Sequence, residues 1–240
     1  MKSKITLLLI FGAILMSFVS TTQIFAQGYG NIPTHGTFAN SNKCFTHPAP
    51  NVNWSNCNQS HVELHFSNLS GANLANTIAK NNLFYNVNLS GASLKNAVLT
   101  GGSFAYSNLS GADLRGADLR DVDFYHTNLS GADLTGANVL GARFPGVDFS
   151  NTKLSGLNMF HVNMIGATLY NADLHNAILT NVDMRNAVFT SANLGNANLA
   201  NSDITGGSFK DADLTGTNIG GLDYSGTDMT CHGNPVCRGD

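Results

Sequence analysis

The chain has 240 residues and a formal net charge of −3, with only 11% charged side chains against 42% hydrophobic ones. Globular domains average about 25% charged residues, and the 31 Asn residues against one Glu make this chain rich in amides. The scarcity of Lys and Arg excludes a basic nucleic-acid-binding protein. The ample apolar fraction argues against a disordered chain, and scarce Glu and Lys disfavour an ordinary helical protein.

Residues 1–26 have the features of a secretory signal. Two lysines precede an apolar stretch over residues 5–19, and a short polar region then leads to Ala26. This order is typical of a segment removed during export, with cleavage expected after Ala26. The apolar stretch is shorter than the ~20 residues of a membrane-spanning helix, and no second run of that length follows. We therefore expect an exported protein, periplasmic or secreted, with no membrane span in the mature chain.

Residues 27–61 lack the period that governs the rest of the chain. They are rich in Asn, Pro, Thr and His and contain the only Trp, Trp54. Repeat arrays need their open ends covered. We therefore expect an N-terminal cap in which Trp54 and Phe45 close the first coil.

A five-residue period begins at Leu64 and continues to Met229. A large apolar residue occupies every fifth position through 34 consecutive quintets, with Ala79 the one exception. The position two residues earlier is nearly always small, and the residue between them is Asp or Asn in 22 of the 34 cases. In extended backbone alternate side chains point the same way, so the small and large apolar residues face the interior and Asp or Asn faces water. Two residues after the large one, Gly or Asn fills 26 of 34 positions, as a tight turn with positive φ requires.

A longer period of 20 residues is superimposed on the quintets. Asn-Leu-Ser-Gly-Ala recurs at 68–72, 88–92, 108–112 and 128–132, and Phe recurs at 84, 104, 124 and 144. Because 20 residues are four quintets, the sequence predicts a coil with four short sides, in which the phenylalanines stack. With ~4.8 Å between stacked strands, the array forms a rod roughly 40 Å long.

The quintets resemble those of the pentapeptide-repeat family. The resemblance is carried by Ala-Asp-Leu-Arg-Gly at 112–116, Ala-Asp-Leu-Thr-Gly at 132–136 and Ala-Asn-Leu-Gly-Asn at 192–196, and it covers about residues 62–231. It implies an all-β fold, a right-handed quadrilateral β-helix with about eight coils of four quintets over residues 62–229. Some members of that family mimic DNA and bind DNA gyrase, while many others, exported ones included, have no assigned activity.

Two departures from the pattern affect the expected packing. Ala79 replaces a large central residue and Asn82 replaces a small inward one, so we expect a bulge or distortion near residues 78–83. Leu157 and Leu222 are bulky residues at positions that are small elsewhere.

All four cysteines lie outside the repeat. Cys44 and Cys57 precede it, while Cys231 and Cys237 fall within residues 230–240, which we expect to form a C-terminal cap. An even number of cysteines in an exported chain favours disulfides. Bridged Cα atoms lie within ~7 Å, and the ends of the rod are ~40 Å apart. We therefore predict one disulfide at each end, Cys44–Cys57 and Cys231–Cys237.

A zinc site is the alternative at the N-terminal end. Cys44, Cys57, His61 and His65 follow the order C-x12-C-x3-H-x3-H. That order is not a familiar zinc spacing, and an oxidising compartment disfavours free thiols.

The sequence offers little that could support catalysis, and we predict no enzyme activity and no cofactor. The single Glu, Glu63, excludes paired Glu acid and base groups, and the eleven Asp residues at outward positions are explained by the repeat. Asp183, Asp203 and Asp223 are the exception, because they stack on one side of successive coils. Carboxylates at ~4.8 Å intervals repel one another unless a cation or the nearby Arg185 relieves them, which makes them a weak calcium candidate.

Two exposed apolar groups are the stronger candidates for a function. By the 20-residue period, one corner of the coil carries an aromatic group, which we call the aromatic corner: Phe66, Tyr85, Tyr106, Tyr125 and His126. Another side carries an aliphatic stripe: Ile78, Val98, Leu140, Phe160 and Ile178. Grouped outward aromatic side chains mark interaction surfaces. We expect a protein partner at the aromatic corner, and a second copy or the N-terminal segment on the stripe.

These features predict a non-enzymatic, exported β-solenoid that acts as a rigid scaffold for an unknown protein partner and can form a homodimer. One alternative is a DNA-mimicking inhibitor or protector of DNA gyrase, if the chain stays in the cytosol. Without Lys2 and Lys4 the net charge is −5, which is modest for a DNA mimic. Another alternative is a secreted factor that acts on a host or neighbouring cell.

Overall fold

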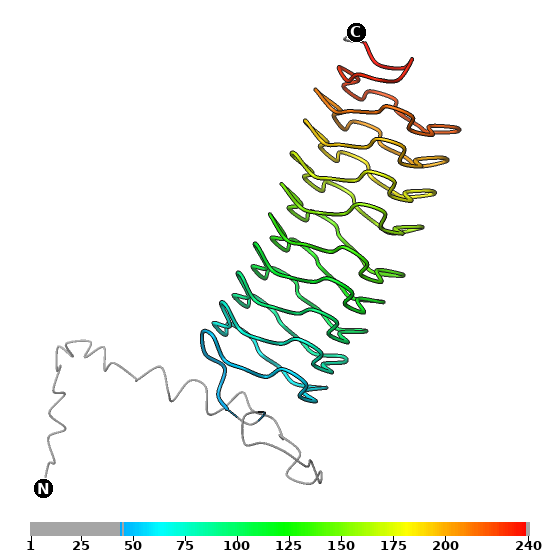
Figure 1. Cartoon of the computed structure of the whole chain (residues 1–240). Helices are drawn as coiled ribbons and strands as arrows, with labels where there is room; N and C mark the ends of the chain where they lie inside the picture. The colour runs from blue at the N-terminus through cyan, green and yellow to red at the C-terminus, as the bar shows by residue number, and fades with distance from the viewer. Residues whose placement is uncertain (1–43, 45, 239–240) are drawn as a thin grey trace, which may run out of the picture.

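The computed structural model describes Cys44 and residues 46–238, which form coils stacked into a rod (Figure 1). The expected signal segment (1–26), residues 27–43 of the expected cap and Phe45 lie outside the described residues. Each coil has four sides of one quintet each, and we name a side after one of its inward central residues: the Leu69, Leu74, Ala79 and Phe84 sides.

Each side contributes a single parallel β-bridge to the neighbouring coil, and no longer strand occurs among the residues described. The bridges join residues 20 apart, as in Asn68↔Asn88 and Asn88↔Asn108. Backbone hydrogen bonds accompany them, for example from the Leu109 N–H to the Asn128 carbonyl at 2.7 Å. The predicted all-β, four-sided coil is confirmed.

The corners between sides take the left-handed backbone conformation that the repeat predicts. Gly111 has φ 65° and Asn176 has φ 58°. Glycine has no Cβ to clash there, and Asn tolerates the region better than most residues do. A corner every fifth residue keeps each side short, which explains why the sides make single bridges.

The interior consists of the inward central residues and the small residues beside them. The predicted phenylalanine ladder is confirmed, because ring centroids lie 4.5 Å apart between Phe84 and Phe104, and 5.4 Å between Phe104 and Phe124. The distance from Phe124 to Phe144 is 5.1 Å. All four rings are buried, and stacking of this kind adds to the free energy of burial.

Hydroxyl side chains occupy several of the small inward positions. Thr77, Thr127 and Thr152 each donate a hydrogen bond to the carbonyl of a central residue 23 positions earlier, at 2.7–2.8 Å. A buried hydroxyl is costly unless it is paired, and this carbonyl supplies the partner. Thr and Ser therefore fit the small position as readily as Ala does.

The expected bulge near residues 78–83 is wrong. Ile78 pairs with Val98 and Leu83 pairs with Ser103, in the same register as elsewhere. The missing volume at Ala79 leaves a cavity of about 10 Å³. Asn82 lines this cavity, is fully buried and accepts the Val62 N–H at 2.9 Å, but its Nδ2 has no partner among the described residues. The substitutions therefore change the packing and leave the backbone in register.

The ladder is interrupted instead beside Leu157. The Asn138–Asn158 bridge is absent from the described part of the Ala79 side, although Asp118 pairs with Asn138 and Asn158 pairs with Ile178. Leu157 is buried in a position that holds a small residue in most coils. Its extra volume forces the two coils apart locally, as overpacking does.

The coiled region begins earlier than the sequence boundary at residue 61, which is therefore wrong. The Asn51 N–H already donates to the Ser70 carbonyl, and the Trp54 N–H donates to the Asn73 carbonyl, both at 2.8 Å. Trp54 occupies an inward central position, is 2% exposed and donates from Nε1 to Thr46 at 2.9 Å. It is a member of the first coil rather than part of a separate cap.

Candidate functional site

The five residues of the aromatic corner lie in one continuous row, where the Phe84 side meets the Leu69 side. Ring centroids are 5.8 Å apart for Phe66 and Tyr85, 5.5 Å for Tyr85 and Tyr106, and 5.4 Å for Tyr106 and Tyr125. The Tyr125 and His126 centroids lie 4.3 Å apart. All four contacts are edge-to-face, the favourable arrangement for neighbouring rings.

Three members of the row adopt a backbone conformation that suits them poorly. Phe66, Tyr106 and His126 have φ of 57°, 60° and 51°, in the left-handed region. A non-glycine residue there costs ~1 kcal/mol or more. The same column of corners has Gly166, Gly206 and Gly226 farther along the rod, so the coil itself does not require large side chains at this corner.

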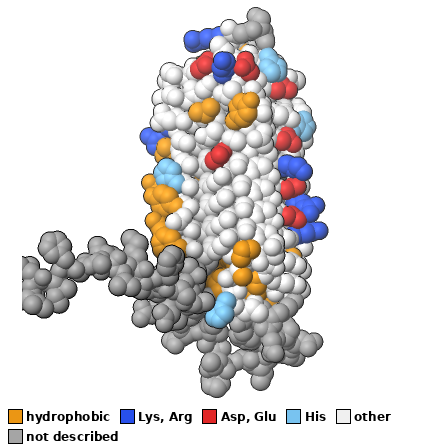
Figure 2. Space-filling model, turned by 90° about the vertical axis from the view of Figure 1, so that its left-hand side faces the viewer, with side chains coloured by type: hydrophobic (Ala, Val, Ile, Leu, Met, Phe, Trp, Pro, Cys, Tyr) orange, Lys and Arg blue, Asp and Glu red, His pale blue; other side chains and the backbone are white. Residues whose placement is uncertain are grey.

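The aromatic corner is exposed and carries no formal charge on its phenols. Phe66 is 66% exposed and Tyr106 is 47% exposed. Partial desolvation, together with the hydrogen-bonded Tyr125 hydroxyl, raises the pKa of Tyr106 above its ordinary value, so this phenol is neutral at physiological pH. Figure 2 shows hydrophobic side chains and a histidine in a row along one edge of the rod, beside a largely uncharged face.

Residues at both ends of the row complete the surface. His65 lies 6.1 Å from Tyr85 between ring centroids, and the exposed Leu83 belongs to the same side. Sequence reasoning missed both, although the 20-residue spacing places them in adjacent columns. At the other end the His126 ring covers Gly146, where an added Cβ would lie 2.7 Å from the ring.

The aliphatic stripe is divided into two groups. Ile78 and Val98 pair with each other, while Leu140, Phe160 and Ile178 lie farther along the same side. The next coil after Val98 carries an ion pair between Arg120 and Asp118 at 2.6 Å. A charged pair within the stripe makes it a poorer candidate for a continuous apolar interface.

The three stacked aspartates do not form a metal site. Arg185 lies 2.7 Å from Asp183 and 3.8 Å from Asp203, and its hydrogen bond to Asp183 lowers the pKa of that carboxyl group. No group of three His, Cys, Asp or Glu side chains within Cys44 and residues 46–238 is placed to hold a metal ion. The guanidinium thus supplies the positive charge for which the calcium candidate was invoked.

Both predicted disulfides are present. Cys44–Cys57 has a Cα–Cα distance of 5.6 Å and Cys231–Cys237 one of 4.9 Å. The zinc alternative is therefore wrong, because its two cysteines are bonded to each other. In the part of the chain that the structure covers, no helix is both long and apolar enough to cross a membrane.

A scan against family models matches the family described as Pentapeptide repeats, in 8 copies over segments that together run from residue 63 to residue 230. The search of curated proteins returns no match.

Solved structures with a similar fold include three proteins described as follows. HetL, a pentapeptide repeat protein involved in heterocyst differentiation regulation from Nostoc sp. strain PCC 7120, is 24% identical, with a TM-score of 0.35 over 72% of this chain and 87% of that one. QnrB1, a plasmid-mediated fluoroquinolone resistance protein, is 21% identical, with a TM-score of 0.48 over 75% and 87% of the two chains. A pentapeptide repeat protein of the Arabidopsis thaliana thylakoid lumen is 26% identical, with a TM-score of 0.40 over 41% and 68%.

Proposed function

Because the chain belongs to the pentapeptide-repeat family and folds as a right-handed quadrilateral β-helix, we propose that it is a non-enzymatic scaffold, exported from the cytosol, that binds a protein partner through the aromatic corner. The observation that carries this proposal is the placing of Phe66, Tyr106 and His126 at left-handed corner positions. Backbone strain of this kind concentrates at functional sites.

The composition of the aromatic corner fits protein recognition. Tyrosine and phenylalanine supply large contact areas with few rotatable bonds, and tyrosine is enriched among the residues that dominate binding energy. The rings already contact one another, so little side-chain entropy remains to be lost on binding. A rigid row of this kind suits a partner with a shallow apolar groove.

The absence of a catalytic arrangement favours a scaffold over an enzyme. Among the described residues the Asp side chains pair with the backbone or with basic residues of the repeat, as in the ion pair of Arg115 with Asp113 at 2.6 Å. Export is supported by the two disulfides, because such bonds persist in oxidising compartments.

The test replaces the rings of the aromatic corner while keeping the coil. A variant with Tyr85→Ser, Tyr106→Asn and Tyr125→Ser retains a residue that tolerates the left-handed corner at 106. We expect the variant to fold with unchanged circular dichroism and to lose the partner that the wild-type protein retains from envelope and extracellular fractions. The matched control is Leu140→Ser, which removes an equally exposed apolar side chain from the Ala79 side.

Retention of the same partner by the triple variant, or its equal loss from the Leu140→Ser control, would remove the aromatic corner as the binding surface. Loss confined to the triple variant supports it.

A further inference from the structure

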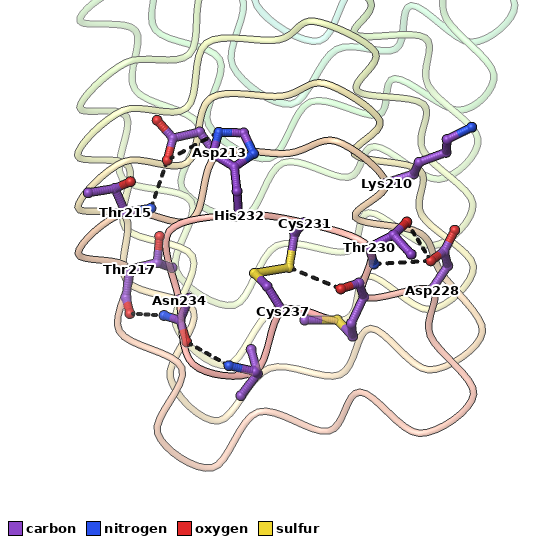
Figure 3. The surroundings of a disulfide bond; sticks show 12 residues. Lys210, Asp213, Thr215, Thr217, Asp228, Thr230, Cys231, His232, Asn234 and Cys237 are labelled. Atoms are coloured by element: carbon purple, nitrogen blue, oxygen red, sulfur yellow. Dashed lines mark hydrogen bonds and ion pairs between the residues drawn. A yellow bond between two sulfur atoms is a disulfide. The ribbon is translucent and has the colours of Figure 1, made fainter. Parts of the chain in front are cut away.

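The C-terminal cap covers only part of the last coil. His232 pairs with Asp213, and the Arg238 N–H donates to the Met229 carbonyl at 2.8 Å. Figure 3 shows the Cys231–Cys237 disulfide within this loop, with Asn234 donating to the Thr217 carbonyl at 3.1 Å. None of these contacts reaches residues 222–227, which form the last quintet of the Phe84 side and its corner.

Residues 222–227 present unpaired backbone groups with a defined register. One coil earlier, the Ile204 N–H donates to the Asp223 carbonyl at 2.8 Å, and the Asp223 N–H donates to the Ser202 carbonyl at 2.9 Å. The equivalent groups of the last coil are the Tyr224 N–H and the Leu222 carbonyl, which have no hydrogen-bond partner within residues 46–238. Unpaired edge groups of this kind are a template for an added strand.

A hollow lies at this edge. It has a volume of about 460 Å³ and is lined by residues 222–227 and Arg238. Tyr224 is 39% exposed, whereas Ile204, the central residue one coil earlier on the same side, is fully buried. An apolar side chain placed above Tyr224 would restore the burial that this position has in the preceding coils.

The charge at the edge favours a basic residue. Arg185 serves Asp183 and Asp203, but Asp223 has no ion-pair partner in the part of the chain described. Hydrogen bonds from the Ser225 side chain and backbone lower the pKa of Asp223, which keeps its carboxylate ionised near neutral pH. A residue stacked on Asp223 at ~4.8 Å would therefore be stabilised by a positive charge.

We propose that this edge binds an extended segment of a protein partner as one added parallel rung. One partner residue, Lys or Arg, lies above Asp223; its N–H donates to the Leu222 carbonyl and its carbonyl accepts from the Tyr224 N–H. The next partner residue is large and apolar and covers Tyr224. Backbone pairing supplies affinity and the two side chains supply specificity, as in other strand additions. The site is independent of the aromatic corner.

The test measures binding of a fluorescein-labelled peptide made of two Ala-Lys-Leu-Ser-Gly quintets to the oxidised protein, by fluorescence anisotropy. We expect saturable binding that weakens with salt. A peptide with Glu in place of Lys should bind less tightly. A peptide N-methylated at both Lys nitrogens should lose about tenfold or more in affinity, because it cannot donate to the Leu222 carbonyl.

Two protein variants locate the binding to the edge. Tyr224→Pro removes the edge donor, which makes no hydrogen bond within the described protein, and proline is tolerated on edge strands. Tyr224→Leu is the matched control that keeps the N–H. We expect the Pro variant to lose binding and the Leu variant to keep it, with Tyr106→Asn unaffected.

No binding to the wild-type protein at about 1 mM peptide would overturn the proposal. So would equal binding of the N-methylated peptide, which requires no change in the protein. If the wild-type protein is a dimer in solution and Tyr224→Pro converts it to a monomer, the edge is occupied by a second copy, and the proposal of a partner segment is wrong.

Discussion

Individual residues of the quintet differ in how strongly the fold constrains them. The central position must fill the interior, and Phe84, Phe104, Phe124 and Phe144 fill it with stacked rings. The corner must accept positive φ, yet Phe66 and Tyr106 occupy it at a cost. The first departure from the consensus is invisible in stability terms and serves packing, while the second opposes stability and points to function.

The phenylalanine stack gives the clearest prediction at the residue scale. Phe124→Ala should lower the free energy of unfolding by about 3–5 kcal/mol, because it removes a buried ring and leaves a cavity between two coils. Phe124→Leu is the control and should cost about 1.5 kcal/mol or less. Urea denaturation followed by circular dichroism measures both. Equal stability of the Ala and Leu variants would show that the neighbouring rings close the gap.

Single sides of the coil explain which predictions from sequence succeeded. The side-chain period placed the inward and outward positions correctly, because alternation in extended backbone leaves no other arrangement. It did not predict how the backbone responds to a misfit. Too little volume at Ala79 left a cavity, whereas too much at Leu157 opened the ladder between Asn138 and Asn158. Strand pairing resists collapse toward a void but cannot make room for extra atoms.

The ends of the array were harder to predict than its middle. Trp54 follows the quintet frame, but Gln59 interrupts the apolar series between it and Leu64, so the pattern alone put the boundary too late. The side chain of Gln59 instead donates to the Cys44 carbonyl at 2.5 Å. The aromatic corner was predictable as a cluster from the 20-residue period, but its partner was not, because recognition depends on a second molecule.

The C-terminal disulfide gives a prediction at the scale of one element. Replacing Cys231 and Cys237 by Ser should release the cap loop, and amide exchange of Asp211 and Leu214 should accelerate by about tenfold or more. Those N–H groups donate to the Thr230 and His232 carbonyls, which the loop holds in place. Hydrogen exchange measured by mass spectrometry follows them, with amides near Phe124 as the internal control. Unchanged exchange at Leu214 would show that the loop holds itself without the disulfide.

The molecule as a whole is a one-dimensional array in which each coil contacts only its neighbours. Binding surfaces on such a rod are columns rather than pockets, because corresponding residues recur 20 positions apart. The aromatic corner is a column of this kind, and the free edge at residues 222–227 is the end of another. The two proposed sites therefore occupy different parts of the rod and can act independently.

Export is tested on the intact protein. We expect the native protein to be found outside the cytosol, with a mass that begins at Gln27 and lacks four hydrogens because of the two disulfides. Mass spectrometry of cytosolic, periplasmic and culture fractions makes this measurement. A full-length, reduced chain in the cytosol would contradict export, and a DNA gyrase supercoiling assay would then be the next experiment.

The hydrogen bonds between coils, such as Leu109 to Asn128, join residues about one coil apart in the sequence. A force pulling the two ends of the rod apart therefore loads only the outermost coil at any moment, and the bonds farther in carry no load until their turn comes. Each coil would release about 60 Å of chain when it peels away, the extended length of 20 residues less the rise it occupied. Under tension the molecule should behave as a spool that pays out in equal steps, beginning at whichever end is less firmly fastened.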